Sequence, residues 1–168
     1  MMSTVERVAA CACGKVRLSA RGTPIVNGAC HCSDCQAGAR LMEGAGARPG
    51  FCDEWGGTAY LSYRDDRLNW LEGREMVRGF KLKPDAPTTR YMTTCCNTAI
   101  FLKYGPGWWT SVYRGRFGDR APPLEMRNKT AHAISPETLP RDVPAYRNFP
   151  MRMVWRLLSA RVAMWLHI

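Results

Sequence analysis

The sequence predicts a mainly β domain, and three observations support this prediction. Short runs in which apolar and polar residues alternate with a period of two recur along the chain. The 15 glycines and 11 prolines favour many short elements joined by turns. The 168 residues are the usual length of one compact domain that buries its own core. We therefore expect an antiparallel β domain rather than a helical bundle.

The expected elements follow from local patterns. Alternation predicts strands at residues 5–10, 15–20, 24–29, 58–63, 68–71, 76–82, 88–93, 98–103 and 108–114. A short helix is expected at 33–42, with Ser33 or Asp34 capping its first N–H groups. The glycine-rich stretch 43–57 is expected to be an irregular loop.

The C-terminal third has a different character. Residues 117–147 are polar and punctuated by prolines, which predicts a loop-rich wrap. Residues 151–166 form the one convincing long helix, and Pro150 suits its first turn. The single domain is therefore divided into a cysteine-bearing β part, a proline-rich wrap and a helix, at residues 1–116, 117–149 and 150–168.

The C-terminal helix is amphipathic, but its polar face is narrow. That face consists of Arg152, Arg156, Ser159 and His167. Arg161 lies nearly opposite, among apolar residues. A helix this apolar must be covered by the domain, by another subunit or by a membrane surface, and its three arginines argue against spanning.

Composition and charge narrow the classes of function. The first apolar stretch carries Glu6 and Arg7, so it lacks the form of a secretory signal, and the default expectation is a cytoplasmic protein. The net charge of +10 suits nucleic acid, anionic lipid or small anions. Trp108 and Trp109 lie in strand patterns with few interleaved basic residues, so no nucleic-acid partner is expected.

The eight cysteines indicate metal binding rather than disulfides. In a reducing compartment disulfides are scarce, and clustered cysteines are more often metal ligands or catalytic thiols. Seven of the eight fall into three clusters, namely Cys11-Ala-Cys13, Cys30-His31-Cys32-Ser33-Asp34-Cys35 and Cys95-Cys96. Only Cys52 stands alone, and it is interpreted as a thiol without a metal, with an approach to the central cluster left open.

The first and last clusters suit one structural zinc ion. Zinc takes four nitrogen or sulfur ligands in a tetrahedron. Cys11 and Cys13 would supply two of them from one turn, and Cys95 and Cys96 would complete the set from far along the chain. Joining such remote strands through one ion stabilises a fold, because the loop that it closes is entropically costly.

The central cluster suits a different kind of zinc site. Cys30, Cys32 and Cys35 give three thiolates between a strand and a helix, which leaves a fourth position for water or substrate, as in catalytic sites. The alternative is a single closed four-cysteine zinc, with the remaining cysteines as core thiols. Alternation points His31 away from the neighbouring ligands, and His132 and His167 are expected at the surface or in packing.

The run Cys11-Ala-Cys13-Gly14-Lys15-Val16-Arg17, followed by the central hexapeptide, resembles the family of glutathione-dependent formaldehyde-activating enzymes. That family pairs C-x-C-G-x-V with C-H-C-x-x-C and a later C-x-x-C-G-T-P element. The resemblance covers about residues 5 to 115 and identifies a divergent member. It implies the β-tent fold, in which small antiparallel sheets surround zinc.

The resemblance also implies site residues and a reaction. By matching position, Cys11, Cys13 and Cys96 would hold a structural zinc, and the central three cysteines would hold a catalytic zinc. The implied activity is a carbon–sulfur lyase that reversibly joins glutathione and formaldehyde. One departure concerns the third motif, where Thr93 occupies the position of the first cysteine and Asn97 that of the glycine. Either Cys95 replaces the lost ligand, which requires a turn or a distortion of the strand, or the structural zinc is incomplete.

Two hypotheses of function follow from these residues. In the first, the open zinc position binds the sulfur of glutathione or a related thiol for attack on a small aldehyde, and basic residues such as Arg40, Arg48, Lys81 or Lys83 meet its carboxylates. In the second, the chain is a zinc-stabilised binding module for a small thiol or a protein partner. The C-terminal helix would then serve for docking to a subunit or as a peripheral membrane contact.

Overall fold

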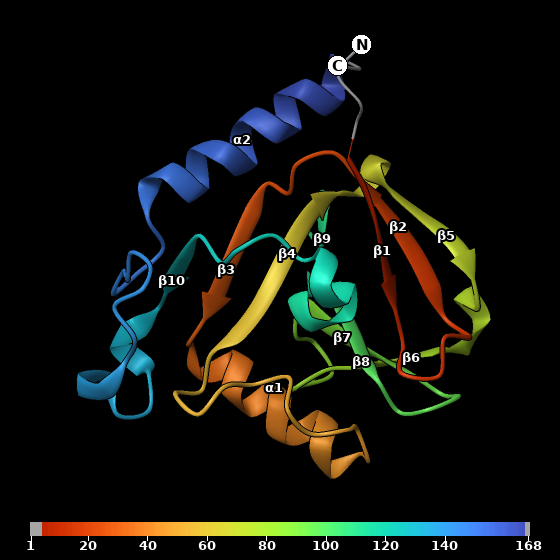
Figure 1. Ribbon diagram of the computed structural model, residues 1–168, viewed down its shortest axis with the longest axis horizontal. Coiled ribbons are helices and arrows are strands. Elements are labelled where there is room, and N and C mark those ends of the chain that lie inside the picture. The colour runs from red at the N-terminus through yellow and green to blue at the C-terminus, as the bar shows by residue number, and fades with distance from the viewer. Residues whose placement is uncertain (1–4, 167–168) are drawn as a thin grey trace.

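The computed structural model describes residues 5–166 and confirms the mainly β class, with two sheets flanked by helices (Figure 1). The strands are β1 (Glu6–Ala10), β2 (Arg17–Arg21), β3 (Val26–Cys30), β4 (Thr58–Arg64), β5 (Leu68–Glu72), β6 (Val77–Phe80), β7 (Thr88–Thr93), β8 (Ala99–Tyr104), β9 (Trp109–Tyr113) and β10 (Met126–Asn128). The α-helices are α1 (Ser33–Gly44) and α2 (Met151–Trp165). Each predicted strand is present, with ends that shift by a few residues.

The strands form a small sheet and a large one. The small sheet has the order β1-β2-β5, and the large sheet has the order β10-β3-β4-β9-β8-β7-β6. Neighbouring strands are antiparallel except for β10 and β3, which run parallel. β10 lies inside the segment that was expected to be a loop-rich wrap, where no strand was predicted. Its three residues are too few to show an alternation, and it is held by a strand far earlier in the chain.

The large sheet separates two hydrophobic cores, because successive side chains of a strand point to opposite faces. On one face, Leu61 of β4 and Val112 of β9 pack against the small sheet. On the other face, the neighbouring Tyr60 and Tyr113 pack with residues of α1 such as Met42. This second face carries the features that concern function. Figure 1 shows α1 and α2 at opposite ends of the molecule, with the large sheet between them.

The C-terminal helix α2 packs on the domain along one side only. Met153 and Leu157 face the protein, where the indole N–H of Trp108 donates to the Leu157 carbonyl at 3.1 Å. The opposite side is exposed, with Trp155 66% accessible and Val162 53% accessible. The domain therefore covers one side of the apolar helix predicted from the sequence and leaves the other side exposed. His167, which was placed on its polar face, lies outside the described residues.

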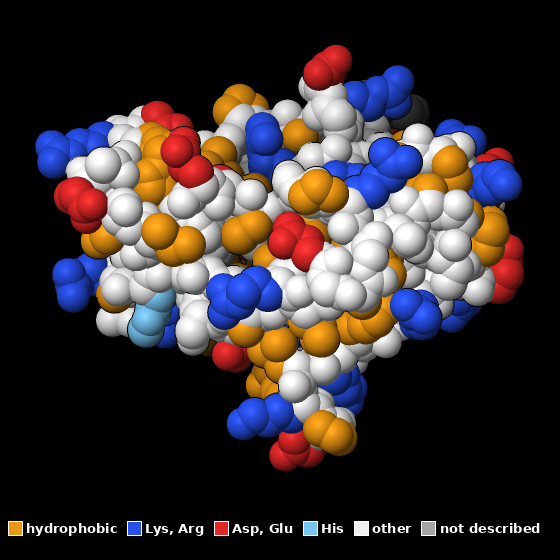
Figure 2. Space-filling view, turned by 90° about the horizontal axis from the view of Figure 1, so that it is seen from below, with side chains coloured by type: hydrophobic (Ala, Val, Ile, Leu, Met, Phe, Trp, Pro, Cys, Tyr) orange, Lys and Arg blue, Asp and Glu red, His pale blue; other side chains and the backbone are white. Residues whose placement is uncertain are grey.

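Basic side chains do not gather into one patch on the face that Figure 2 shows. Lysines and arginines there lie apart from one another, with acidic side chains among them (Figure 2). Trp108 and Trp109 pack against each other with ring centroids 5.2 Å apart, in keeping with their expected place in a strand pattern. Within residues 5–166, none of the helices has the length and apolarity needed to cross a bilayer.

Candidate metal centres and the adjoining chamber

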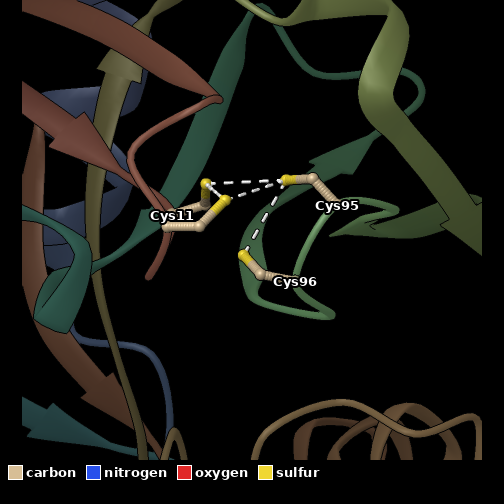
Figure 3. Close-up of side chains that lie close together, drawn as sticks. Cys11, Cys95 and Cys96 are labelled. Atoms are coloured by element: carbon tan, nitrogen blue, oxygen red, sulfur yellow. Dashed lines mark hydrogen bonds between the residues drawn. The ribbon is translucent and has the colours of Figure 1, made fainter.

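The first candidate centre joins two turns that are remote in sequence. Cys11 and Cys13 lie in the turn between β1 and β2, where Gly14 adopts a left-handed conformation with φ of +77°. Cys95 and Cys96 lie in the turn between β7 and β8 (Figure 3). The four Sγ atoms lie within 4.8 Å of one another. The structure thus brings together the four cysteines that the sequence analysis assigned to one site.

The turn after β7 explains how two adjacent cysteines serve one centre. The N–H of Asn97 donates to the Thr93 carbonyl at 3.0 Å, and Asn97 has a positive φ of 53°. This turn ends the strand alternation, so Cys95 and Cys96 can both face Cys11. Thr93 brings no sulfur to the cluster. Its hydroxyl lies 3.4 Å from the Cys96 sulfur and accepts a hydrogen bond from the Thr98 N–H. Cys95 therefore stands where the motif predicts a replacement ligand.

The sulfur geometry fits a tetrahedral zinc ion. Zinc–sulfur bonds of about 2.3 Å in a tetrahedron place the sulfur atoms about 3.8 Å apart. The Cys11 sulfur lies 3.6 Å from that of Cys13 and 3.8 Å from that of Cys95. The Cys95 sulfur lies 3.4 Å from that of Cys13 and 3.8 Å from that of Cys96. Four soft thiolate ligands in this arrangement favour zinc and leave no position open.

The surroundings also favour thiolates at this centre. Desolvation raises the pKa of Cys96, but hydrogen bonds from the hydroxyls of Thr93 and Thr98 outweigh it and lower this pKa to about 5. The side chain of Arg116 lies nearby. Burial lowers its pKa, while charge on Cys96 and Cys11 raises it. A cation at this place offsets the negative charge of a four-thiolate centre.

The second candidate centre lies where β3 passes into α1. Cys30 ends β3, Cys32 is the N-cap of α1, and Cys35 lies in its first turn. Their Sγ atoms lie within 4.8 Å of one another. The expected cap by Ser33 or Asp34 is wrong, because the sulfur of Cys32 accepts the Cys35 N–H at 3.3 Å. The cap of this helix is thus itself a candidate metal ligand.

The helix start favours a negative charge on the three thiols. Hydrogen bonds from the thiols of Cys30 and Cys35, together with N–H groups of the first turn, lower the pKa of Cys32 to about 2. The pKa of Cys30 is raised, first by its hydrogen bonds with Cys32 and Cys35. These shifts favour a thiolate at Cys32, and a metal ion would displace the protons of the neighbouring thiols.

The other candidate residues lie outside both centres. His31 is fully buried and points away from the cysteines, with Nε2 3.8 Å from an oxygen of Asp53. Cys52 belongs to neither cluster, and its sulfur accepts from the Thr58 hydroxyl at 3.8 Å. The exposed His132 offers its carbonyl to Gln36. His31 thus lies away from the neighbouring cysteines, as alternation predicted, and His132 lies at the surface.

The three-cysteine centre opens onto a chamber of about 240 Å³. The chamber lies on the face of the large sheet that also carries α1, and all three cysteines line it. Its walls include apolar side chains of the sheet, namely Val26, Leu102, Tyr104 and Trp109. A larger cavity of about 400 Å³ lies in the proline-rich wrap, but no cysteine lines it. The chamber is therefore the cavity that can serve the three thiols.

Two polar residues of the chamber were not anticipated from the sequence. The hydroxyl of Tyr60 lies 3.6 Å from the Cys35 sulfur, and burial, followed by charge on Cys35, raises the pKa of Tyr60. Arg90 is 4% exposed and donates to the Asp34 carbonyl at 2.8 Å. Both residues lie in ordinary strand patterns, so no local signal distinguishes them. None of the basic residues expected to meet carboxylates, Arg40, Arg48, Lys81 and Lys83, lines the chamber.

Residues 2–104 match DUF6151, a family of unknown function. The chain belongs to this family. The matched segment contains all seven clustered cysteines, whereas β10 and α2 lie beyond it. Among curated proteins, none matches this DUF6151 chain. A crystal structure of a Rhodobacter sphaeroides protein is similar at 14% identity with a TM-score of 0.47, covering 84% of this chain and 99% of that one.

Proposed function

We propose that this DUF6151 protein is a zinc-dependent carbon–sulfur lyase that reversibly joins a thiol and a small aldehyde, as in the glutathione-dependent formaldehyde-activating enzymes that the sequence resembles. One observation carries the proposal. The four-cysteine centre already holds a complete ligand set, whereas the three-cysteine centre has one ligand fewer and opens onto a chamber. Three protein ligands with room for a fourth are the arrangement of catalytic zinc.

The thiols and the chamber would divide the chemistry between them. Zinc held by Cys30, Cys32 and Cys35 would supply a fourth position and lower the pKa of a thiol that occupies it. The chamber would hold the aldehyde carbon against that sulfur and limit the access of water. In the forward direction the S–H bond breaks, a sulfur–carbon bond forms, and the proton passes to the former carbonyl oxygen. The reverse reaction returns the proton to sulfur.

Tyr60 has a supporting part in this scheme. Burial raises its pKa, so its hydroxyl keeps its proton at neutral pH and can donate a hydrogen bond. The Cys35 sulfur lies 3.6 Å away and accepts that bond when it is a thiolate. Such a bond orients the sulfur and tempers its charge, as outer contacts do at other metal sites. Tyr60 is therefore a positioning residue.

The proposal is tested by following adduct formation in the zinc-loaded protein. Carbon-13 formaldehyde and a thiol panel that includes glutathione are mixed, and the new sulfur-bound carbon is observed by NMR. We expect formation above the uncatalysed rate, and we expect Cys32→Ala to abolish the excess while Cys52→Ala retains it. These two cysteines make a matched pair, because only the first belongs to a cluster. Zinc-replete protein that gives no excess with any thiol would refute the lyase.

A second candidate is a zinc-stabilised module that binds a small thiol without turning it over. The lining of the chamber favours it in one respect. Among the described residues that line the chamber there is no histidine, and its one carboxylate belongs to Asp34. Asp34 is thus the one carboxylate in that lining that could accept a proton beside the three thiols, a small set of groups for acid–base chemistry. Saturable thiol binding in calorimetry, combined with no adduct formation in the NMR assay, would identify this module.

A further inference from the structure

The roof of the chamber comes from the C-terminal segment, which lies outside the region of resemblance. Phe149, Met153 and Leu157 form this roof, and they line the chamber together with the three cysteines. Met153 and Leu157 are half-buried, whereas the neighbouring Met151 is 66% accessible and Leu158 is 46% accessible. Phe149, which precedes the helix, is 46% accessible. One side of α2 thus belongs to the chamber, and the other side belongs to the surface.

Specific contacts hold this roof in place at several points. Asn128 of β10 directs its amide toward the Met153 sulfur at 3.9 Å, and Trp108 donates to the Leu157 carbonyl. On the outside, Arg156 pairs with Glu125 at 2.7 Å. The roof is therefore held in a fixed position, and its side chains help to set the size and polarity of the chamber.

The chamber has few charged side chains in its lining. Among the described residues that line it, Arg90 is the one cation, and its guanidinium already bonds the Asp34 carbonyl. Gly38 of α1 lets this arginine lie against the helix, because a Cβ there would stand 2.0 Å from its Nε. Arg90 is therefore fixed in position. The large side chains of the remaining lining are aromatic or aliphatic, and they stand among shorter polar ones, namely Asp34, Ser62, Thr88, Ser111 and Asn128.

Size and polarity together select a class of thiol. About 240 Å³ is room for roughly eight groups of the size of a water molecule or a methylene. Glutathione is far larger and carries two carboxylates and an ammonium group. A charge that enters an apolar space without a partner is strongly disfavoured. One fixed arginine cannot match two carboxylates.

Resting on the function proposed above, we propose that the thiol of the three-cysteine centre is a small molecule with an apolar body, which the roof of α2 selects over the charged tripeptide. Its sulfur would approach Cys30, Cys32 and Cys35, and its body would lie against Met153 and Leu157. Each methylene that enters such a space should raise affinity about fourfold, until the chamber is full.

The first test is calorimetric titration of the zinc-loaded full chain with ethanethiol, butanethiol, hexanethiol and glutathione. We expect affinity to rise along the alkyl series and to exceed that of glutathione at least tenfold for hexanethiol. Glutathione binding as tightly as hexanethiol would overturn the inference and leave the lyase proposal standing. Binding by none of the thiols would overturn both.

The second test places the thiol beneath the roof. Leu157→Phe adds bulk to the chamber, whereas Leu158→Phe adds the same bulk to the exposed side of the same helix. We expect the first variant to lose at least tenfold in hexanethiol affinity and the second to match the parent. Met153→Phe and Met151→Phe form an independent pair should Leu157→Phe fail to fold. Unchanged hexanethiol affinity in a folded, chamber-filling variant would overturn the inference.

Discussion

Replacing Cys95 and Cys96 together with serine would remove half of the four-cysteine centre and so cut the link between its two turns. The centre closes a long loop, since Cys11 and Cys95 are 84 residues apart in sequence. A cross-link that closes a loop of this length lowers the entropy of the unfolded chain by an amount worth about 4.5 kcal/mol. We therefore expect the double variant to lose roughly that free energy of unfolding and one zinc ion per chain.

The assay is urea denaturation of the zinc-loaded proteins, combined with metal content per chain. Cys52→Ser is the matched control, because it removes a half-buried cysteine that belongs to neither cluster. The control should keep its zinc, and its free energy of unfolding should change far less. A double variant that retains the parent's zinc content, or that unfolds at the parent's urea concentration, would refute the assignment of this centre.

The remaining predictions concern the surroundings of the three-cysteine centre. Gly38→Ala should lower the free energy of unfolding by about 1–3 kcal/mol, because its Cβ would meet an arginine side chain at 2.0 Å. Gly44→Ala in the same helix has nothing within 4 Å and should be neutral or stabilising by up to about 1 kcal/mol, so equal losses in urea denaturation would contradict this reasoning. The Tyr60→Phe variant should keep its zinc, and its free energy of unfolding should fall by about 1 kcal/mol because the hydrogen bond to Cys35 is lost. Loss of zinc on metal analysis would show that the hydroxyl does more than orient this sulfur. Burial lowers the pKa of His31, so below about pH 6.5 the unfolded chain binds a proton that the folded chain does not, and stability should fall on acidification. His31→Gln should reduce that dependence in melts at several pH values, and an unchanged dependence would exclude His31 as its source.

Much of the grouping of the cysteines into two candidate metal centres was predictable, because cysteine spacing is a local signal. The Cys-Gly turn at Cys13 and the strand-to-helix passage at Cys30 each carry their own pattern of residues. The pairing of Cys11 with Cys95 also follows from ligand number, since two cysteines alone cannot complete a tetrahedron. A turn at Cys95 and Cys96 was predictable, because adjacent residues can bind one metal ion only where the strand alternation ends.

The chamber was not predictable because its lining is assembled by tertiary contacts. Tyr60 and Arg90 occupy strand positions that alternation marks only as inward or outward. Leu157 lies in the same apolar pattern as any buried helix residue, so the sequence cannot distinguish a residue that lines a cavity from one that packs in a core. β10 has three residues and pairs with β3, a strand about a hundred residues earlier. A pairing between such distant segments leaves no pattern in the neighbouring sequence. Sequence thus predicts the thiols better than the space that they face.

The candidate metal ligands and the roof of the chamber lie in separate stretches of this chain. Every clustered cysteine lies within residues 2–104, the part that defines the family, whereas the roof at Met153 and Leu157 lies about fifty residues beyond that part. Substitutions in the roof can therefore reshape the chamber without touching a thiol. Members of DUF6151 that share the cysteines but differ in the C-terminal helix would keep one metal chemistry and diverge in the molecules that they accept.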